Sequence, residues 1–233
     1  YLNVRNSTSF YGQDYSNENL SLILPRLALQ ASFARLLGLP GRTYLSVGAL
    51  TDAGVTDDAD LAKQRADASS GFVAGDFQLT TLQPLGFGPE GMGLYLNLEG
   101  QATGDALPVS LQKTIGGIRT VRGYPEREAF GDQGLHLNAE LRLPSVTVTL
   151  PGGEAGKGGS LQPLFFYDYG YVKSESSLAG TDDEVTLSSY GIGLIGSWEG
   201  GFNSGVYVGV PLETAVRTEQ HDARAHFELN FRF

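Results

Sequence analysis

The most constraining feature of this sequence is an alternation of apolar and polar residues that returns along most of the chain. In residues 224–233, RAHFELNFRF, every second residue is apolar, and polar residues such as His226 and Glu228 lie between them. Residues 135–143, LHLNAELRL, alternate in the same way. A period of two residues places successive side chains on opposite faces of a β-strand, so each segment is predicted to be a strand with one apolar and one polar face.

About ten such segments of roughly ten residues can be counted, which is the length that a transmembrane barrel strand needs. They cover residues 1–12, 19–38, 42–54, 71–86, 92–103, 135–143, 164–172, 186–200, 205–213 and 224–233. The segment 19–38 also fits a helix, and we interpret it as a strand because its neighbours are strands.

The connections between these segments are polar or glycine-rich. Stretches around 51–70, 151–160 and 174–184 are predicted to be loops, and the longest loop spans 107–134. Short and long connections alternate, which is typical of barrels with short turns at one rim and long loops at the other.

Two fold classes produce alternating strands, a soluble β-sandwich and a transmembrane barrel. Here the aromatic faces hold little charge, whereas the opposite faces hold ionisable residues such as Glu140 and Asp168. A barrel places aromatic residues at the lipid interface and polar residues in its lumen. The full-length last strand, which ends on Phe233, also favours the barrel. We therefore predict an all-β fold, an antiparallel transmembrane β-barrel forming one domain over residues 1–233, with the sandwich as the alternative.

Composition narrows the possible functions. The formal net charge of -10 argues against nucleic-acid binding, because neutralising phosphates needs a basic surface. The absence of cysteine rules out thiol catalysis. The glycine pattern of residues 191–196, GIGLIG, matches a dinucleotide fingerprint, but a turn follows it where the fingerprint needs a helix. No serine, histidine or carboxylate pattern indicates a catalytic or metal site, so we predict no enzyme, no metal and no cofactor.

Residues 115–144, IGGIRTVRGYPEREAFGDQGLHLNAELRLP, carry the strongest functional signal. The motifs in this region and the strand after it are Val121-Arg122-Gly123-Tyr124, Gly131-Asp132-Gln133-Gly134, Glu140-Leu141-Arg142 and Phe166-Tyr167-Asp168-Tyr169-Gly170. In order and spacing they resemble the long surface loop and following strands of the TpsB proteins, the two-partner secretion transporters that export haemagglutinins and haemolysins. The resemblance covers about residues 110–233 and is weaker before them.

This resemblance implies that the loop of residues 107–134 folds back into the barrel lumen, where Arg122 meets an acidic residue of the inner wall. By the alternation, Asp168 and Glu140 lie on the polar faces of adjacent strands, and a guanidinium binds carboxylates in a forked geometry. Gly123 lets the backbone turn where a side chain would clash. The predicted loop lock consists of Val121, Arg122, Gly123, Tyr124, Glu140 and Asp168. The remaining motif residues are Gly131, Asp132, Gly134, Arg142, Phe166 and Gly170.

The family resemblance also implies a location and partners. The protein is expected to be a multi-pass barrel of the outer membrane, in contact with membrane lipid and lipopolysaccharide, with a secreted polypeptide as its substrate and no nucleic acid. The terminal aromatics Phe231 and Phe233 resemble the signal that outer-membrane barrels present to their assembly machinery.

One departure from the family leaves alternatives open. Family members have about sixteen strands and preceding periplasmic domains, whereas this chain supplies strands that resemble the last ten. We expect either the C-terminal part of a longer transporter or a reduced relative, whose barrel other chains could complete. The alternative functions are a structural or assembly subunit of an outer-membrane complex without transport, and an insertase-like relative.

Overall fold

The structure, a computed structural model, describes residues 2–10, 13–36, 39–52, 56–65, 67–149, 158–176 and 183–231. Its strands are β1 (Leu2–Phe10), β2 (Gln13–Leu22), β3 (Arg26–Leu36), β4 (Leu39–Thr51), β5 (Val73–Pro84), β6 (Gly93–Thr103), β7 (Lys113–Ile115), β8 (Ala129–Gly131), β9 (Gln133–Arg142), β10 (Val146–Thr149), β11 (Gly158–Lys173), β12 (Glu184–Trp198), β13 (Phe202–Pro211) and β14 (Arg224–Phe231). The helical elements are α1 (Asp58–Gln64) and the 3₁₀ turn η1 (Val109–Leu111).

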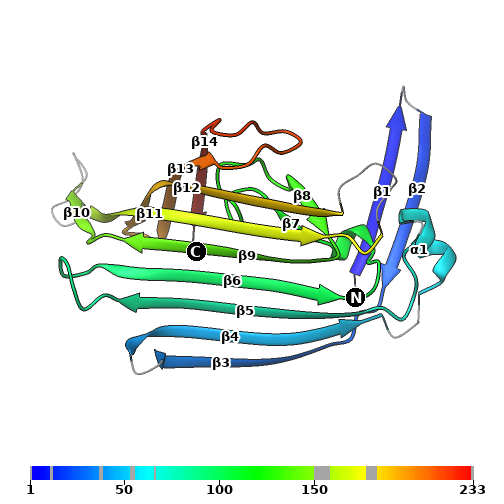
Figure 1. Ribbon diagram of the computed structural model, residues 1–233, viewed down its shortest axis with the longest axis horizontal. Coiled ribbons are helices and arrows are strands. Elements are labelled where there is room, and N and C mark those ends of the chain that lie inside the picture. The colour runs from blue at the N-terminus through cyan, green and yellow to red at the C-terminus, as the bar shows by residue number, and fades with distance from the viewer. Residues whose placement is uncertain are drawn as a thin grey trace.

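A ten-stranded antiparallel sheet makes up most of the molecule and curls from strand to strand between β3 and β14 (Figure 1). Its order follows the chain, β3-β4-β5-β6-β9-β11-β12-β13-β14, and the short strand β10 pairs with β11. In the described part of the chain β3 and β14 are its two edges. β1 and β2 form a separate hairpin, and β7 pairs with β8 inside the connection between β6 and β9. The predicted all-β antiparallel architecture is confirmed.

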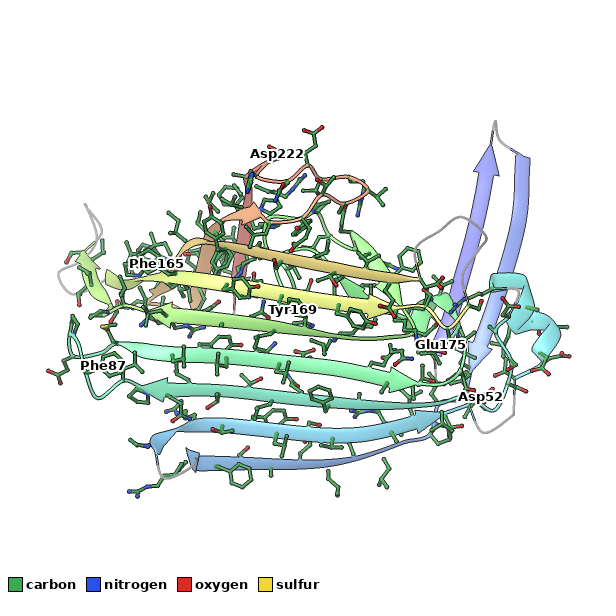
Figure 2. The ribbon with its side chains drawn as sticks, viewed as in Figure 1. Asp52, Phe87, Phe165, Tyr169, Glu175 and Asp222 are labelled. Carbon is green, nitrogen blue, oxygen red and sulfur yellow. The ribbon has the colours of Figure 1, made fainter. Side chains whose placement is uncertain are left out.

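The connections divide between the two rims of this sheet. The long ones, residues 52–72, 104–132, 174–183 and 212–223, follow β4, β6, β11 and β13, and we call their end the long-loop rim. Shorter turns follow β5 and β12 at the other end. Figure 2 shows Asp52 and Glu175 near the long-loop rim and Phe87 at the opposite rim.

The two faces of the sheet have the reverse of the polarity expected for a soluble protein. On β11 the carboxylate residue Asp168 is 0% exposed, whereas Phe165 is 53% exposed. Figure 2 shows Phe165 and Tyr169 along this strand. Further exposed apolar residues lie on other strands, among them Leu29, Val47, Phe77, Ile192, Val208 and Phe227. Such an apolar surface needs a lipid or protein cover, which favours the barrel over the sandwich.

Two sequence predictions are wrong in detail. The polar stretch around 51–70, predicted to be a loop, contains helix α1. Asp57 caps this helix by accepting a hydrogen bond from the backbone N–H of Ala59 at 2.9 Å, and acidic residues in its first turn interact favourably with the helix dipole.

The segment 19–38, predicted to be one strand, is divided between β2 and β3 at residues 23–25. Pro25 lies at the break. Proline has no N–H to donate to a strand ladder, so the strand ends there.

No helix among the described residues is long and apolar enough to cross a membrane.

Candidate functional site

The connection of residues 104–132 packs against the inner face of the sheet, the face that carries Asp168. It places Ile115, Val121 and Tyr124 in one buried apolar cluster with Val172 of β11 and Leu187 of β12. Figure 1 shows β7 and β8 of this connection next to β11 and β12. The loop therefore covers the wall formed by β9 and β11–β14, which we call the loop-covered wall.

Glycine makes room for the loop on β11. A Cβ added to Gly170 would lie 2.7 Å from Cγ2 of Val121, well inside van der Waals contact. Gly131 and Gly134 serve a related purpose at the end of the loop, where the chain passes close to β11, and a Cβ added to Gly131 would lie 2.6 Å from the backbone oxygen of Lys173. These motif glycines allow close contact between backbones.

Arg122 forms a forked ion pair with Asp168. Its Nε donates to Oδ2 of Asp168 at 2.7 Å, and its Nη2 donates to Oδ1 at 2.8 Å. The backbone N–H of Arg122 donates to the same carboxylate at 3.0 Å. The guanidinium is 3% exposed. Two side-chain bonds and one backbone bond therefore hold one turn of the loop to one position on β11.

A second carboxylate and two rings complete the surroundings of the guanidinium. Glu140 of β9 accepts from Nη1 of Arg122 at 2.7 Å, and its other oxygen accepts from Arg142 at 2.8 Å. The guanidinium carbon of Arg122 lies 3.8 Å from the ring centroid of Phe166 and 5.0 Å from that of Tyr207. Burial lowers the pKa of Arg122, but the hydrogen bonds and charges of Asp168 and Glu140 outweigh it and raise the pKa above its ordinary value.

Asn138 of β9 joins the loop to the same carboxylate. Its Nδ2 donates to Oδ1 of Asp168 at 2.9 Å and to the backbone oxygen of Thr120 at 2.6 Å. Asn138 lies opposite Asp168 in the β9–β11 register. The amide therefore fixes both the orientation of the carboxylate and the approach of the loop.

Gly123 turns the loop tip at a position that only glycine adopts without strain. Its φ is +96°, and an added Cβ would lie 3.1 Å from the backbone carbon of Gly209 in β13. Its N–H donates to Nε2 of His226 in β14 at 2.9 Å. The tip is thus in contact with the last two strands of the sheet as well as with β11.

Tyr124 anchors the loop to the connection between β13 and β14. Its hydroxyl lies 3.1 Å from the backbone oxygen of Ser188 and 3.0 Å from that of Glu213. The backbone N–H of Glu213 donates to the same hydroxyl at 3.0 Å. Burial is the main cause that raises the pKa of Tyr124 to about 12, so the hydroxyl stays protonated at neutral pH.

Asp132 is the point where three long connections meet. Its fully buried carboxylate accepts from Nη2 of Arg65 at 2.8 Å, from the N–H of Leu107 at 2.9 Å and from the N–H of Glu175 at 2.8 Å. Arg65 also donates to the backbone oxygen of Ser176 at 2.7 Å. Burial raises the pKa of Asp132, but the hydrogen bonds from Arg65 and the two backbone amides outweigh it and lower the pKa below its ordinary value. We call this junction the rim clasp.

The fourth long connection is tied to the same loop by Arg217. Its backbone N–H donates to Glu128 at 2.6 Å, and its guanidinium donates to the backbone oxygens of Glu126 and Arg127 at 3.0 and 2.8 Å. The connection 104–132 therefore has contacts with all three other long connections.

The wall formed by β3–β6 has a different character, and we call it the groove wall. A groove of about 330 Å³ lies on its inner face. It is lined by Arg26, Gln30, Tyr44, Ser46, Asp76, Phe77, Gln78, Glu99, Gly100, Gln101 and Lys113. In this groove Arg26 pairs with Asp76 at 2.6 Å, yet both side chains stay partly exposed, at 43% and 28%.

The terminal aromatics lie only partly within the described chain. The ring of Phe231 is 64% exposed and stacks on Phe202 with 4.8 Å between centroids, and Phe202 stacks on Trp198. Phe233 lies outside the described residues.

No group of three or more His, Cys, Asp or Glu residues within the described ranges could hold a metal ion.

Several residues of this site carried no signal in the sequence. Asn138 and His226 lie on polar strand faces, as the alternation predicts, but nothing in the pattern distinguished them from other polar residues there. Arg65 and Arg217 lie in connections without any periodicity. Their contacts with Asp132 and Glu128 join positions 67 and 89 residues apart.

Comparison with known proteins gives one family match and one structural match. The family model described as haemolysin secretion/activation protein ShlB/FhaC/HecB matches residues 25–196. Among solved structures, the chain is similar to CdiB from Escherichia coli, with a TM-score of 0.67 and 18% sequence identity over 92% of this chain. The chain spans 37% of the length of that structure. A search of curated proteins gave no match.

Proposed function

Since the chain belongs to the haemolysin secretion/activation family, we propose that it forms part of an outer-membrane β-barrel that transports a secreted polypeptide, with a pore gated by the loop of residues 107–134. The observation that carries the gating proposal is the buried Arg122, which the loop places against Asp168 and Glu140 of the inner wall. The residues that form this contact all lie within the matched range 25–196.

An ionic lock suits a loop that must leave its site and return. In the closed state the guanidinium is bound by two carboxylates and lies on the Phe166 ring. Removing one partner of a buried pair costs about 3–5 kcal/mol, because the other charge stays buried without compensation. When the whole loop moves, water in the open pore solvates the guanidinium and the two carboxylates. Releasing the loop therefore costs less free energy than removing one partner by mutation. The closed state is stable, and opening stays reversible.

The surroundings proposed for the barrel follow from its faces. Lipid covers the exposed apolar face, lipopolysaccharide lies at the long-loop rim, and Phe231 with Phe233 forms the signal for the barrel assembly machinery. We treat residues 1–233 as one barrel domain. The alternatives of a structural subunit and of an insertase-like relative are not favoured, because the matching family consists of secretion and activation proteins.

The lock is tested with Arg122→Ala in the intact transporter. We expect a raised pore conductance in planar bilayers or a loss of secretion. The matched control is Arg119→Ala, since Arg119 is an exposed arginine of the same loop and should change neither property. Heat-modifiable migration on gels verifies that each variant has folded into the membrane. If conductance and secretion both stay unchanged in Arg122→Ala, the lock is wrong.

A disulfide tests whether the loop must move. Residues 1–233 contain no cysteine, and position 170 lies in contact with the Val121 side chain, so the pair Val121→Cys and Gly170→Cys can be cross-linked without a competing thiol in this part of the transporter. We expect secretion to stop in the oxidised protein and to return after reduction. Normal secretion by the cross-linked form would show that transport does not require loop movement.

A further inference from the structure

We propose that His226 is a positioning residue of the loop lock, which holds the tip only while its imidazole is neutral, so that mild acid weakens closure of the pore. This inference rests on the proposed gating function. It adds a residue of the last strand and a sensitivity to pH that the pairing of Arg122 with Asp168 does not supply.

The direction of the hydrogen bond determines the protonation state of the ring. A backbone N–H can only donate, and the N–H of Gly123 lies 2.9 Å from Nε2 of His226. Nε2 must therefore carry its lone pair, and the proton of the neutral ring is on Nδ1. Protonation makes both ring nitrogens donors, so the bond to Gly123 is lost and two N–H groups face each other.

The tip has little room to adjust to such a change. On one side an added Cβ at Gly209 of β13 would lie 2.6 Å from the backbone nitrogen of Gly123. Gly209 is the register partner of Arg224, two residues before His226 on β14. The tip backbone thus lies between a glycine and an imidazole on adjacent strands, and losing the acceptor removes its contact with β14.

The charges around His226 come from three sides. On β14 itself Arg224 and Glu228 flank it, and the hydroxyl of its cross-strand partner Tyr207 donates to Glu228 at 3.1 Å. The loop contributes Arg122 and Glu126. β11 contributes Asp168, which already accepts three hydrogen bonds from Arg122. A proton on His226 therefore adds a second cation close to the guanidinium of the lock.

Histidine is suited to this task because its ordinary pKa of about 6.5 places its charge change near neutral pH. The guanidinium of Arg122 keeps its charge throughout this pH range, because arginine does not lose its proton in proteins. Mild acid thus removes one support of the tip and leaves the ionic support in place. Closure weakens without being abolished.

The test is single-channel recording of the intact transporter at pH 8 and pH 5. The wild type should open roughly two- to tenfold more often at pH 5, the effect of losing one ordinary hydrogen bond. His226→Gln keeps an acceptor at a similar position and cannot titrate, so its openings should be rare at both pH values. His226→Phe has no acceptor, so its openings should be frequent at both. A His226→Gln variant that keeps the wild-type response to pH would overturn the proposal.

Two further variants separate this inference from the gating function. Arg122→Ala should open the pore at both pH values, and if it does not, the gating proposal itself fails. If Arg122→Ala opens the pore while His226→Phe behaves as the wild type at pH 8, only the role of His226 fails. Gly209→Ala should displace Gly123 sterically and raise opening without any dependence on pH.

Discussion

The loop-covered wall and the groove wall are built from strands of the same alternating pattern, yet their ion pairs differ in solvent exposure. In the loop-covered wall, Arg122 is 3% exposed and bound to two carboxylates. In the groove wall, the pair of Arg26 with Asp76 has a similar distance, 2.6 Å, and stays open to solvent. The comparison shows that strand pattern alone supplies polar inner faces, whereas packing by the loop buries one set of charges.

The largest effect is expected when the same substitution is made at Arg122, under the loop, and at Arg26, in the groove. Arg122→Gln leaves Asp168 without its cation and Glu140 with Arg142 alone, and should destabilise loop closure by about 3–5 kcal/mol. Arg26→Gln removes a solvent-exposed pair and should leave loop closure unchanged. Limited proteolysis within residues 115–131, followed by mass spectrometry, measures both. Equal cleavage of the two variants would mean that burial does not distinguish the walls.

A second prediction separates the rim clasp from the loop tip by pH. The pKa of Asp132 is lowered from 3.8 on folding, so its contribution is present above pH 3.8 and is lost as the pH falls through the folded-state value. In mild acid the clasp should hold, whereas the bond from Gly123 to His226 should weaken.

Hydrogen exchange at the amides of Leu107 and Glu175, which both donate to Asp132, measures this difference once intrinsic rates are corrected for pH. Asp132→Asn should reduce their protection at neutral pH, because a hydrogen bond to a charged group contributes about 1.5–3 kcal/mol. Loss of protection of these two amides at pH 5 in the wild type would show that Asp132 does not hold the rim clasp at that pH.

The smallest effect is expected for Tyr124→Phe. This change removes the hydroxyl that contacts Ser188 and Glu213 but keeps the buried ring in its apolar cluster. Closure should weaken by about 1 kcal/mol, and the amide of Glu213 should exchange faster. Tyr167→Phe, on the exposed face of β11, is the matched control. If both variants exchange alike at Glu213, the hydroxyl does not hold the connection between β13 and β14.

The sequence allowed the fold to be predicted because strand alternation is a local property. Segments such as 135–143 and 164–172 show their two faces without reference to any partner. Helix α1 was missed because seven residues are too few to show a helical period, and the cap at Asp57 is a common loop residue. The break between β2 and β3 was missed because the apolar run continues across Pro25.

By itself the sequence determined the strands, their two faces and the three charged residues of the buried contact, since Arg122, Glu140 and Asp168 lie in motifs and on polar strand faces. The tertiary structure alone decided the other contacts of the loop. Gly123 and His226 are 103 residues apart, Tyr124 and Glu213 are 89 apart, and Arg65 and Asp132 are 67 apart. Contacts across such distances follow no period along the chain. They exist only because the curled sheet and the inward course of one loop bring these residues together.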